Sequence, residues 1–130
     1  MSHWTRAKVK INVNAVNETL LLSALEILAK EIGGKVAKNV IVRGFRHSVQ
    51  CPYAVLCTLP YGNGYGILLS NELTVVVDEH GAPLSAAEFA ERLTQLYTAL
   101  AVISAAQSLQ MEPQLVSESK ERIVIDLVRW

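Results

Sequence analysis

The chain has 130 residues, of which 51% are hydrophobic and 18% charged, and its 12 Lys and Arg residues balance 12 Asp and Glu residues. Charged residues usually make up about a quarter of a soluble domain, so a chain this apolar has either a large core or an apolar surface that a partner covers. The balanced charge gives no overall attraction to nucleic acid or anionic lipid, and no apolar run reaches the ~18 residues that span a bilayer. The start, MSHWTRAK, lacks the apolar segment that follows in a signal peptide. We therefore expect a cytoplasmic protein with no membrane segment.

The first two predicted elements are a strand and a helix. Residues 4–13 alternate between apolar and polar side chains, which is typical of a half-buried strand. Apolar residues then recur at helical spacing between Leu21 and Ile32. Asn17 is a suitable N-cap, and Gly33 can end the helix in the left-handed conformation. The pattern predicts a helix between these two residues that is buried over much of its circumference.

Four further strands are predicted at residues 35–43, 53–59, 65–70 and 73–77. The glycine-rich stretch PYGNGYG at residues 60–66 precedes the third of these strands. It has neither the spacing of a nucleotide-binding loop nor a helix after it to hold a phosphate. Asn63 followed by Gly64 is instead typical of a hairpin turn, since both residues tolerate positive φ. We expect these glycines to turn the chain rather than to hold a phosphate.

The last two predicted elements are a helix and a strand. Ser85 and Glu88 have the spacing of a capping box, which predicts a helix from residue 85 to about Met111, before Pro113. Residues 117–128 alternate again and predict a final strand. The order β-α-β-β-β-β-α-β indicates one α+β domain over residues 1–130, with a two-layer arrangement. We expect a mainly antiparallel sheet with two helices on one face.

The densest basic and aromatic cluster is RGFRH at residues 43–47. Its first three residues are similar to an RNA-binding strand motif, but Arg46 and His47 stand where a small residue and a second aromatic belong. A solvated loop is one interpretation of the cluster. The other is a binding site for a small anion or metabolite, because arginines and a histidine can hold a phosphate or carboxylate. The residues of this candidate site are Arg43, Arg46, His47, Tyr53 and Tyr61.

No catalytic residue, metal site or cofactor is predicted. The three histidines fall on separate predicted loops or chain ends, and no serine has the context of a nucleophile elbow. Asp78 belongs to an acidic turn, DEH, that we interpret as solvated. Cys51 and Cys57 lie six residues apart in an extended stretch, a separation of about 20 Å along one strand. We expect free thiols that are buried or half-buried rather than a disulfide.

Five short motifs occur in an order that resembles a known family. They are MSHW at the start, VRGF at residues 42–45, NGYGI at 63–67, RLTQLY at 92–97 and LVRW at 127–130. The chain resembles an uncharacterised family first listed among conserved hypothetical reading frames of plastid and cyanobacterial genomes, with archaeal and bacterial relatives. Members of that family typically have an Asp where this chain has Gly66. The resemblance implies a small soluble α+β protein with no assigned activity and no catalytic residues.

The leading functional hypothesis is a non-enzymatic protein that binds a protein partner or assembles with itself as a homodimer. The small apolar residues of ALAVISAA at residues 99–106 would allow a helix to pack closely, either inside the domain or against a second copy. The alternative is small-anion or metabolite binding, with or without catalysis, at the Arg and His cluster. Nucleic-acid binding has the weakest support, because it requires a basic stripe in a chain with no net charge.

Overall fold

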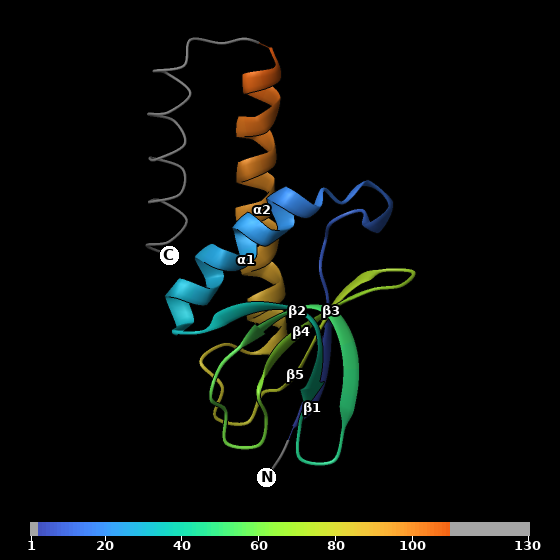
Figure 1. The fold of residues 1–130 in the computed structure, drawn as a ribbon, viewed down its shortest axis with the longest axis vertical. Coiled ribbons are helices and arrows are strands. Elements are labelled where there is room, and N and C mark those ends of the chain that lie inside the picture. Colours follow the sequence, from blue (N-terminus) through green and yellow to red (C-terminus); the bar gives the residue numbers. More distant parts are fainter. Residues whose placement is uncertain (1–2, 110–130) are drawn as a thin grey trace.

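The computed structural model describes residues 3–109, which form a five-stranded antiparallel sheet with two helices on one face (Figure 1). This arrangement confirms the predicted α+β class. The strand order in the sheet is β1-β5-β4-β3-β2. The elements are β1 (Trp4–Lys8), a 3-10 turn η1 (Val13–Ala15), α1 (Glu18–Ile32), β2 (Lys35–Arg43), β3 (Ser48–Leu56), β4 (Gly64–Leu69), β5 (Leu73–Asp78) and α2 (Ala86–Ser108).

The predicted bounds agree with the structure best for the helices and for β2. The first strand is shorter than predicted, because the chain leaves the sheet after Lys8 and enters η1. The prediction for β3 was wrong at both ends, since this strand begins at Ser48 and stops before Cys57. The predicted strand at residues 117–128 and the predicted helix end near Met111 lie outside the described residues.

Both helices begin where the capping residues predicted, and α1 also ends where predicted. The Asn17 side chain accepts a hydrogen bond from the Leu20 N–H, and Gly33 ends α1 with a φ of 72°. At α2, the Ser85 hydroxyl accepts from the Glu88 N–H at 3.1 Å while the Glu88 carboxylate accepts from the Ser85 N–H at 2.9 Å. This reciprocal pair satisfies two amides that have no partner inside the helix.

Replacing Ser85 with alanine should therefore destabilise the protein by about 1 kcal/mol, the usual cost of removing an N-cap side chain. Urea unfolding followed by circular dichroism would measure this difference. Ser70→Ala is the matched control, because Ser70 is exposed and lies outside any helix or strand. Equal midpoints for the two variants would show that the cap contributes nothing to stability.

The main core lies between the helices and the sheet. Tyr65 of β4 is fully buried and stacks on Phe89 of α2, with ring centroids 4.4 Å apart. Its hydroxyl donates to the Leu84 carbonyl at 2.7 Å and accepts from the Leu84 N–H at 3.0 Å, which fixes the loop before α2. The largest other fully buried side chains of this core are Leu21, Leu25, Leu28, Ile67, Leu73, Leu93 and Leu96.

A second, smaller core lies on the opposite face of the sheet. The β2–β3 hairpin bends at Asn39, which has a φ of 52°, and at Pro52, the residue across from it in the register. Beyond the bend, the far half of the hairpin crosses the helix-free face, as the curved β2 and β3 ribbons show (Figure 1). The cluster that forms there contains the fully buried side chains of Val42, Cys51, Ala54 and Val76.

The two cysteines are free thiols, as predicted, with Cys51 buried in the second core and Cys57 half-buried. The far half of the hairpin can approach the sheet because Gly66 has no side chain. A Cβ at Gly66 would lie 2.4 Å from the Cys51 Sγ and 3.1 Å from methyl carbons of both Val42 and Val76. The second core therefore depends on a glycine at this position of β4.

Candidate functional site

The glycine-rich stretch turns the chain, as predicted, but through a longer loop than a two-residue hairpin. Residues 57–63 connect β3 to β4, and Gly64 already belongs to β4, where it has a φ of 152°. Asn63 is not in the positive-φ conformation expected from the sequence. Its side-chain oxygen instead accepts from the Arg43 N–H at 2.8 Å, and its side-chain nitrogen donates to the Ile41 carbonyl at 3.1 Å. Asn63 thus ties the loop to the far half of β2.

Asp78, at the end of β5, is a buried carboxylate that holds three segments together. Its Oδ1 accepts from the His3 N–H at 2.7 Å and its Oδ2 accepts from the Phe45 N–H at 3.1 Å. Burial by itself would raise the pKa of Asp78, but the backbone N–H groups of His3, Phe45 and His80 outweigh it and leave this pKa below its usual value. The interpretation of Asp78 as a solvated turn residue was therefore wrong.

The hairpin tip sits directly on this carboxylate because Gly44 permits close approach. A Cβ at Gly44 would lie 2.8 Å from the Trp4 ring and 2.9 Å from the Asp78 Oδ2. Gly62 makes a similar approach on the next loop, where a Cβ would lie 2.7 Å from the Arg43 carbonyl oxygen. The tip of the hairpin is thus fixed against the end of the sheet by backbone contacts that leave its larger side chains exposed.

Those exposed side chains form what we call the tip surface: Phe45, Arg46, His47, Tyr61 and His80. The rings of His80 and Tyr61 lie 5.2 Å apart, and those of Tyr61 and Phe45 lie 5.6 Å apart in an edge-to-face arrangement. The Arg46 guanidinium carbon lies 5.5 Å from the centroid of the Phe45 ring, in the range of a cation–π contact. His47 stacks on Trp4, with ring centroids 5.4 Å apart and planes 6° from parallel.

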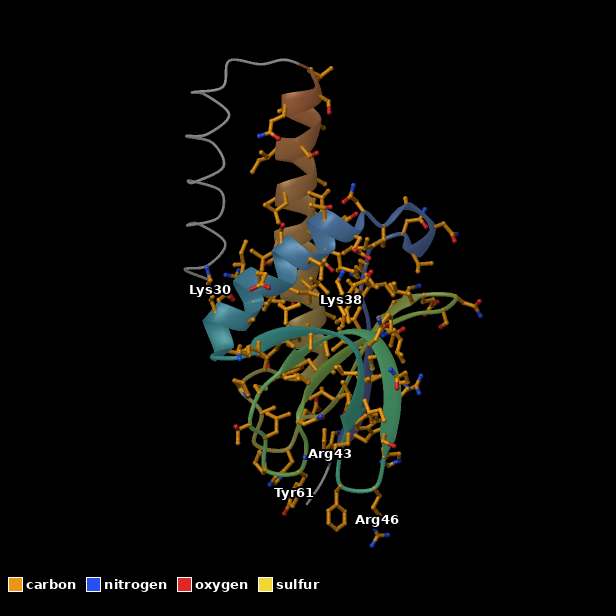
Figure 2. All side chains as sticks on the ribbon, viewed as in Figure 1. Lys30, Lys38, Arg43, Arg46 and Tyr61 are labelled. Atoms are coloured by element: carbon orange, nitrogen blue, oxygen red, sulfur yellow. The ribbon has the colours of Figure 1, made fainter. Side chains whose placement is uncertain are left out.

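The structure brings together four of the five residues of the predicted anion site. One end of the sheet, where the tip of the β2–β3 hairpin lies, carries Arg43, Arg46 and Tyr61 (Figure 2). Arg46 extends from there away from the body of the molecule. His47 belongs to the same tip. Tyr53 does not join them, because it lies on the helix-facing side of β3 and its hydroxyl donates to the Glu18 carboxylate of α1.

Sequence reasoning missed the two residues that matter most to this surface. Phe45 is 59% exposed, and its position in the quoted RGFRH cluster was the available signal. Asp78 gave no comparable signal, because its three backbone donors come from positions far apart in the sequence.

The tip surface carries groups suited to binding. Exposed aromatic rings supply apolar contact, and a guanidinium supplies charge-assisted hydrogen bonds to carboxylates or phosphates. Within residues 3–109, no three His, Cys, Asp or Glu side chains gather as a metal site would require. In the same range, no helix has the length and apolar content needed to cross a bilayer.

Comparison with known proteins adds no further assignment: no family model, no curated protein and no solved structure matches this chain.

Proposed function

We propose that this protein is a non-enzymatic binding protein whose tip surface docks an acidic, partly apolar segment of a protein partner. The observation that carries the proposal is Phe45, a large apolar side chain that is 59% exposed on a hairpin tip anchored by a buried carboxylate. A surface that is already held in one conformation loses little entropy when a partner binds. Aromatic and arginine side chains are also the types that contribute most at protein interfaces.

The charge at this end of the molecule favours an acidic partner. Arg43 and Arg46 are both exposed there. The nearby carboxylates are engaged within the fold, since Asp78 is buried and Glu79 accepts from the Ala86 N–H at 2.7 Å. The exposed charge of the tip is thus positive in a chain whose formal net charge is zero.

The same geometry gives less support to the other candidates. Neutralising only two phosphates with two arginines gives weak affinity for nucleic acid, because each phosphate contact adds only a small electrostatic contribution. A small metabolite needs a concave site, whereas Arg46 extends from a protruding hairpin (Figure 2). A second copy of this chain would bring the same positive tip to the interface if the tips met about a two-fold axis.

The proposal can be tested by selecting peptides from a random displayed library on the immobilised full-length protein. We expect the selected peptides to combine Asp or Glu with aromatic or aliphatic residues. Fluorescence anisotropy of one labelled peptide should show a loss of about tenfold or more in affinity for Phe45→Ala and for Arg46→Ala, the size of effect that central interface residues usually give.

The matched controls are Val102→Ala, an apolar side chain that is 58% exposed on α2, and Lys30→Ala, an exposed cation at the end of α1. Both controls should keep the wild-type affinity. Peptides without acidic residues, or an equal loss in all four variants, would contradict the proposal. Light scattering of the free protein tests self-assembly. If the protein is a dimer that the Phe45→Ala change dissociates, the tip surface binds a second copy of this chain and not a different protein.

A further inference from the structure

All three histidines of the chain lie at the tip end of the sheet, although they belong to segments far apart in the sequence. His3 and His80 each donate a backbone N–H to the carboxylate of Asp78. His47 follows two residues after Phe45, which donates its N–H to the same carboxylate. The three histidines are all exposed. Because histidine is the residue type whose charge ordinarily changes between about pH 5 and 8, this end of the molecule is the one that responds to pH near neutrality.

His47 lies where an aromatic ring stabilises an added positive charge. Its imidazole stacks on the indole of Trp4, with ring centroids 5.4 Å apart and planes 6° from parallel. A cation over the face of a tryptophan ring is attracted by it. The ionisable side chains on the surrounding elements are Arg46 in the tip, Arg43 on β2, Arg6 on the Trp4 face of β1 and the buried Asp78 at the end of β5. The one carboxylate among these four is buried, so a proton on His47 increases the exposed positive charge of the tip surface.

His80 adds charge from a different loop. Its ring lies 5.2 Å from the ring of Tyr61, which in turn contacts Phe45. Two carboxylates precede it in the chain. Asp78 is buried, and Glu79 accepts a hydrogen bond from the first N–H of α2 at 2.7 Å. Since both carboxylates are engaged within the fold, a proton on His80 also increases the exposed positive charge of the tip surface.

His3 differs from the other two histidines. Its Nε2 lies 3.6 Å from the Oε1 of Glu79. A proton on His3 is therefore balanced by an adjacent carboxylate. The ring contacts of the tip surface involve His47 and His80 but not His3. His3 thus provides a matched control, a histidine at the same end of the molecule but outside the tip surface.

The anchor of the tip surface keeps its charge over the pH range in which histidines titrate. The pKa of Asp78 lies below its usual value, which is about 4. Its carboxylate therefore stays ionised between about pH 7.5 and 5.5 and continues to accept from His3, Phe45 and His80. Over this range the charge of the tip surface changes while its backbone support does not.

We propose that protonation of His47 and His80 makes the tip surface bind an acidic partner more tightly as the pH falls below neutrality. The exposed cations at this end then rise from two, Arg43 and Arg46, to four. The inference rests on the proposed function, because it concerns the regulation of the same surface. By linkage, a partner that binds the protonated form better must also cause the protein to take up protons when it binds.

Fluorescence anisotropy of the labelled acidic peptide selected from the library, measured at pH 7.5 and 5.5 and at one ionic strength, tests the proposal. We expect binding to be about three- to tenfold tighter at pH 5.5, because one exposed ion pair contributes up to about fivefold in affinity. The carboxylates of the peptide stay ionised over this range, since their usual pKa is about 4. The same peptide with Asn and Gln in place of Asp and Glu should show no gain at pH 5.5.

Glutamine variants identify the responsible side chains, because glutamine is polar and does not take up a proton. The double variant His47→Gln with His80→Gln should lose the gain, with equal affinities at the two pH values. His3→Gln should keep the wild-type ratio of affinities. Calorimetry of the unmodified protein at pH 6.5, in two buffers with different protonation enthalpies, should show proton uptake on binding without any substitution.

The possible results separate this inference from the proposed function. Peptide binding that depends on Phe45 and Arg46 but not on pH would overturn the inference and leave the proposed function in place. A gain that persists in the double variant, or that His3→Gln abolishes, would also overturn it, because other groups would then be responsible. Absence of Phe45-dependent binding at both pH values would contradict the proposed function itself, and this inference with it.

Discussion

The Asp78→Asn variant is expected to be less stable than the wild-type protein by about 2–4 kcal/mol at neutral pH, since hydrogen bonds to a buried charge contribute more than neutral ones. The carboxylate of Asp78 faces only donors, from His3, Phe45 and His80. An asparagine has one acceptor oxygen instead of two, and its NH₂ group would point a donor at another donor. At least one backbone N–H would then be buried without a partner. Urea unfolding followed by tryptophan fluorescence is a suitable measurement in a Trp130→Phe background, where Trp4 is the remaining tryptophan, because the Trp4 ring lies close to Gly44 and Asp78.

The control for this variant is Glu72→Gln, which removes an exposed carboxylate that pairs with Lys8 at 3.2 Å on the surface. We expect that change to cost less than about 1 kcal/mol, because exposed ion pairs contribute little. Asp78→Asn should also weaken peptide binding at the tip surface, since the Phe45 N–H loses its anchor. An Asp78→Asn protein with wild-type stability would show that the carboxylate does not hold the three segments together.

The same residue makes stability depend on pH in a definite direction. The pKa of Asp78 is lowered in the folded protein, so its contribution to stability is complete above the unfolded-state pKa, which is about 4. That contribution is lost as the pH falls through the lower, folded-state pKa. The wild-type protein should therefore lose part of its stability between about pH 5 and the acid limit of folding. The Asp78→Asn variant should lack this part of the loss, and an identical pH dependence of the two proteins would contradict the assignment.

The sequence was sufficient for the features that depend on neighbouring residues. Asn17, Gly33 and the Ser85–Glu88 pair each act within one helical turn, so their spacing alone located the ends of α1 and the start of α2. The bounds of β2 were also predicted, because its Val and Ile residues are bracketed by the helix end at Gly33 and by Gly44.

The sequence was insufficient where the chain changes the layer that it packs against. In β3, Cys51 belongs to the second core while Tyr53, on the same side of the strand, belongs to the main core. The side of the strand that faces the protein interior changes at Pro52, so the alternation of apolar residues is interrupted there. The predicted strand accordingly began at Tyr53, although the ladder with β2 extends back to Ser48.

In the candidate site, too, the features set by neighbouring residues were predicted and those set by contacts between distant segments were not. The RGFRH cluster is contiguous, and four of the predicted residues do lie at one end of the sheet. Tyr61 and His80 reach the tip surface from two other loops, and their positions follow from the bend in the hairpin rather than from any local pattern. Tyr53 was grouped with them by residue type, but its place in the register sets it opposite Lys38, on the near side of the bend.

Gly66→Ala is the sharpest test of that bend, because a single added methyl group would lie 2.4 Å from the Cys51 Sγ. The backbone of β4 and the far half of the hairpin must separate to make room, and overpacking of this kind typically costs about 1–3 kcal/mol. We expect urea unfolding to show a loss in that range and hydrogen exchange to show faster opening of the far half of β3.

Truncating Cys51 should reverse much of that loss, since it removes the sulfur that the new methyl group meets. Cys51→Ala alone leaves a small cavity and should destabilise the protein, whereas in the Gly66→Ala background it should stabilise it. The double-mutant cycle would then give a coupling energy of about 0.5–3 kcal/mol between the two positions. Gly33→Ala is the control for the added methyl group, because a Cβ at residue 33 would have no neighbouring atom within 4 Å. The loss of stability in this control comes only from placing alanine at a φ of 72°. Additive effects of Gly66→Ala and Cys51→Ala would mean that the hairpin does not pack across the helix-free face in solution, and the tip surface would then lose its anchor as well.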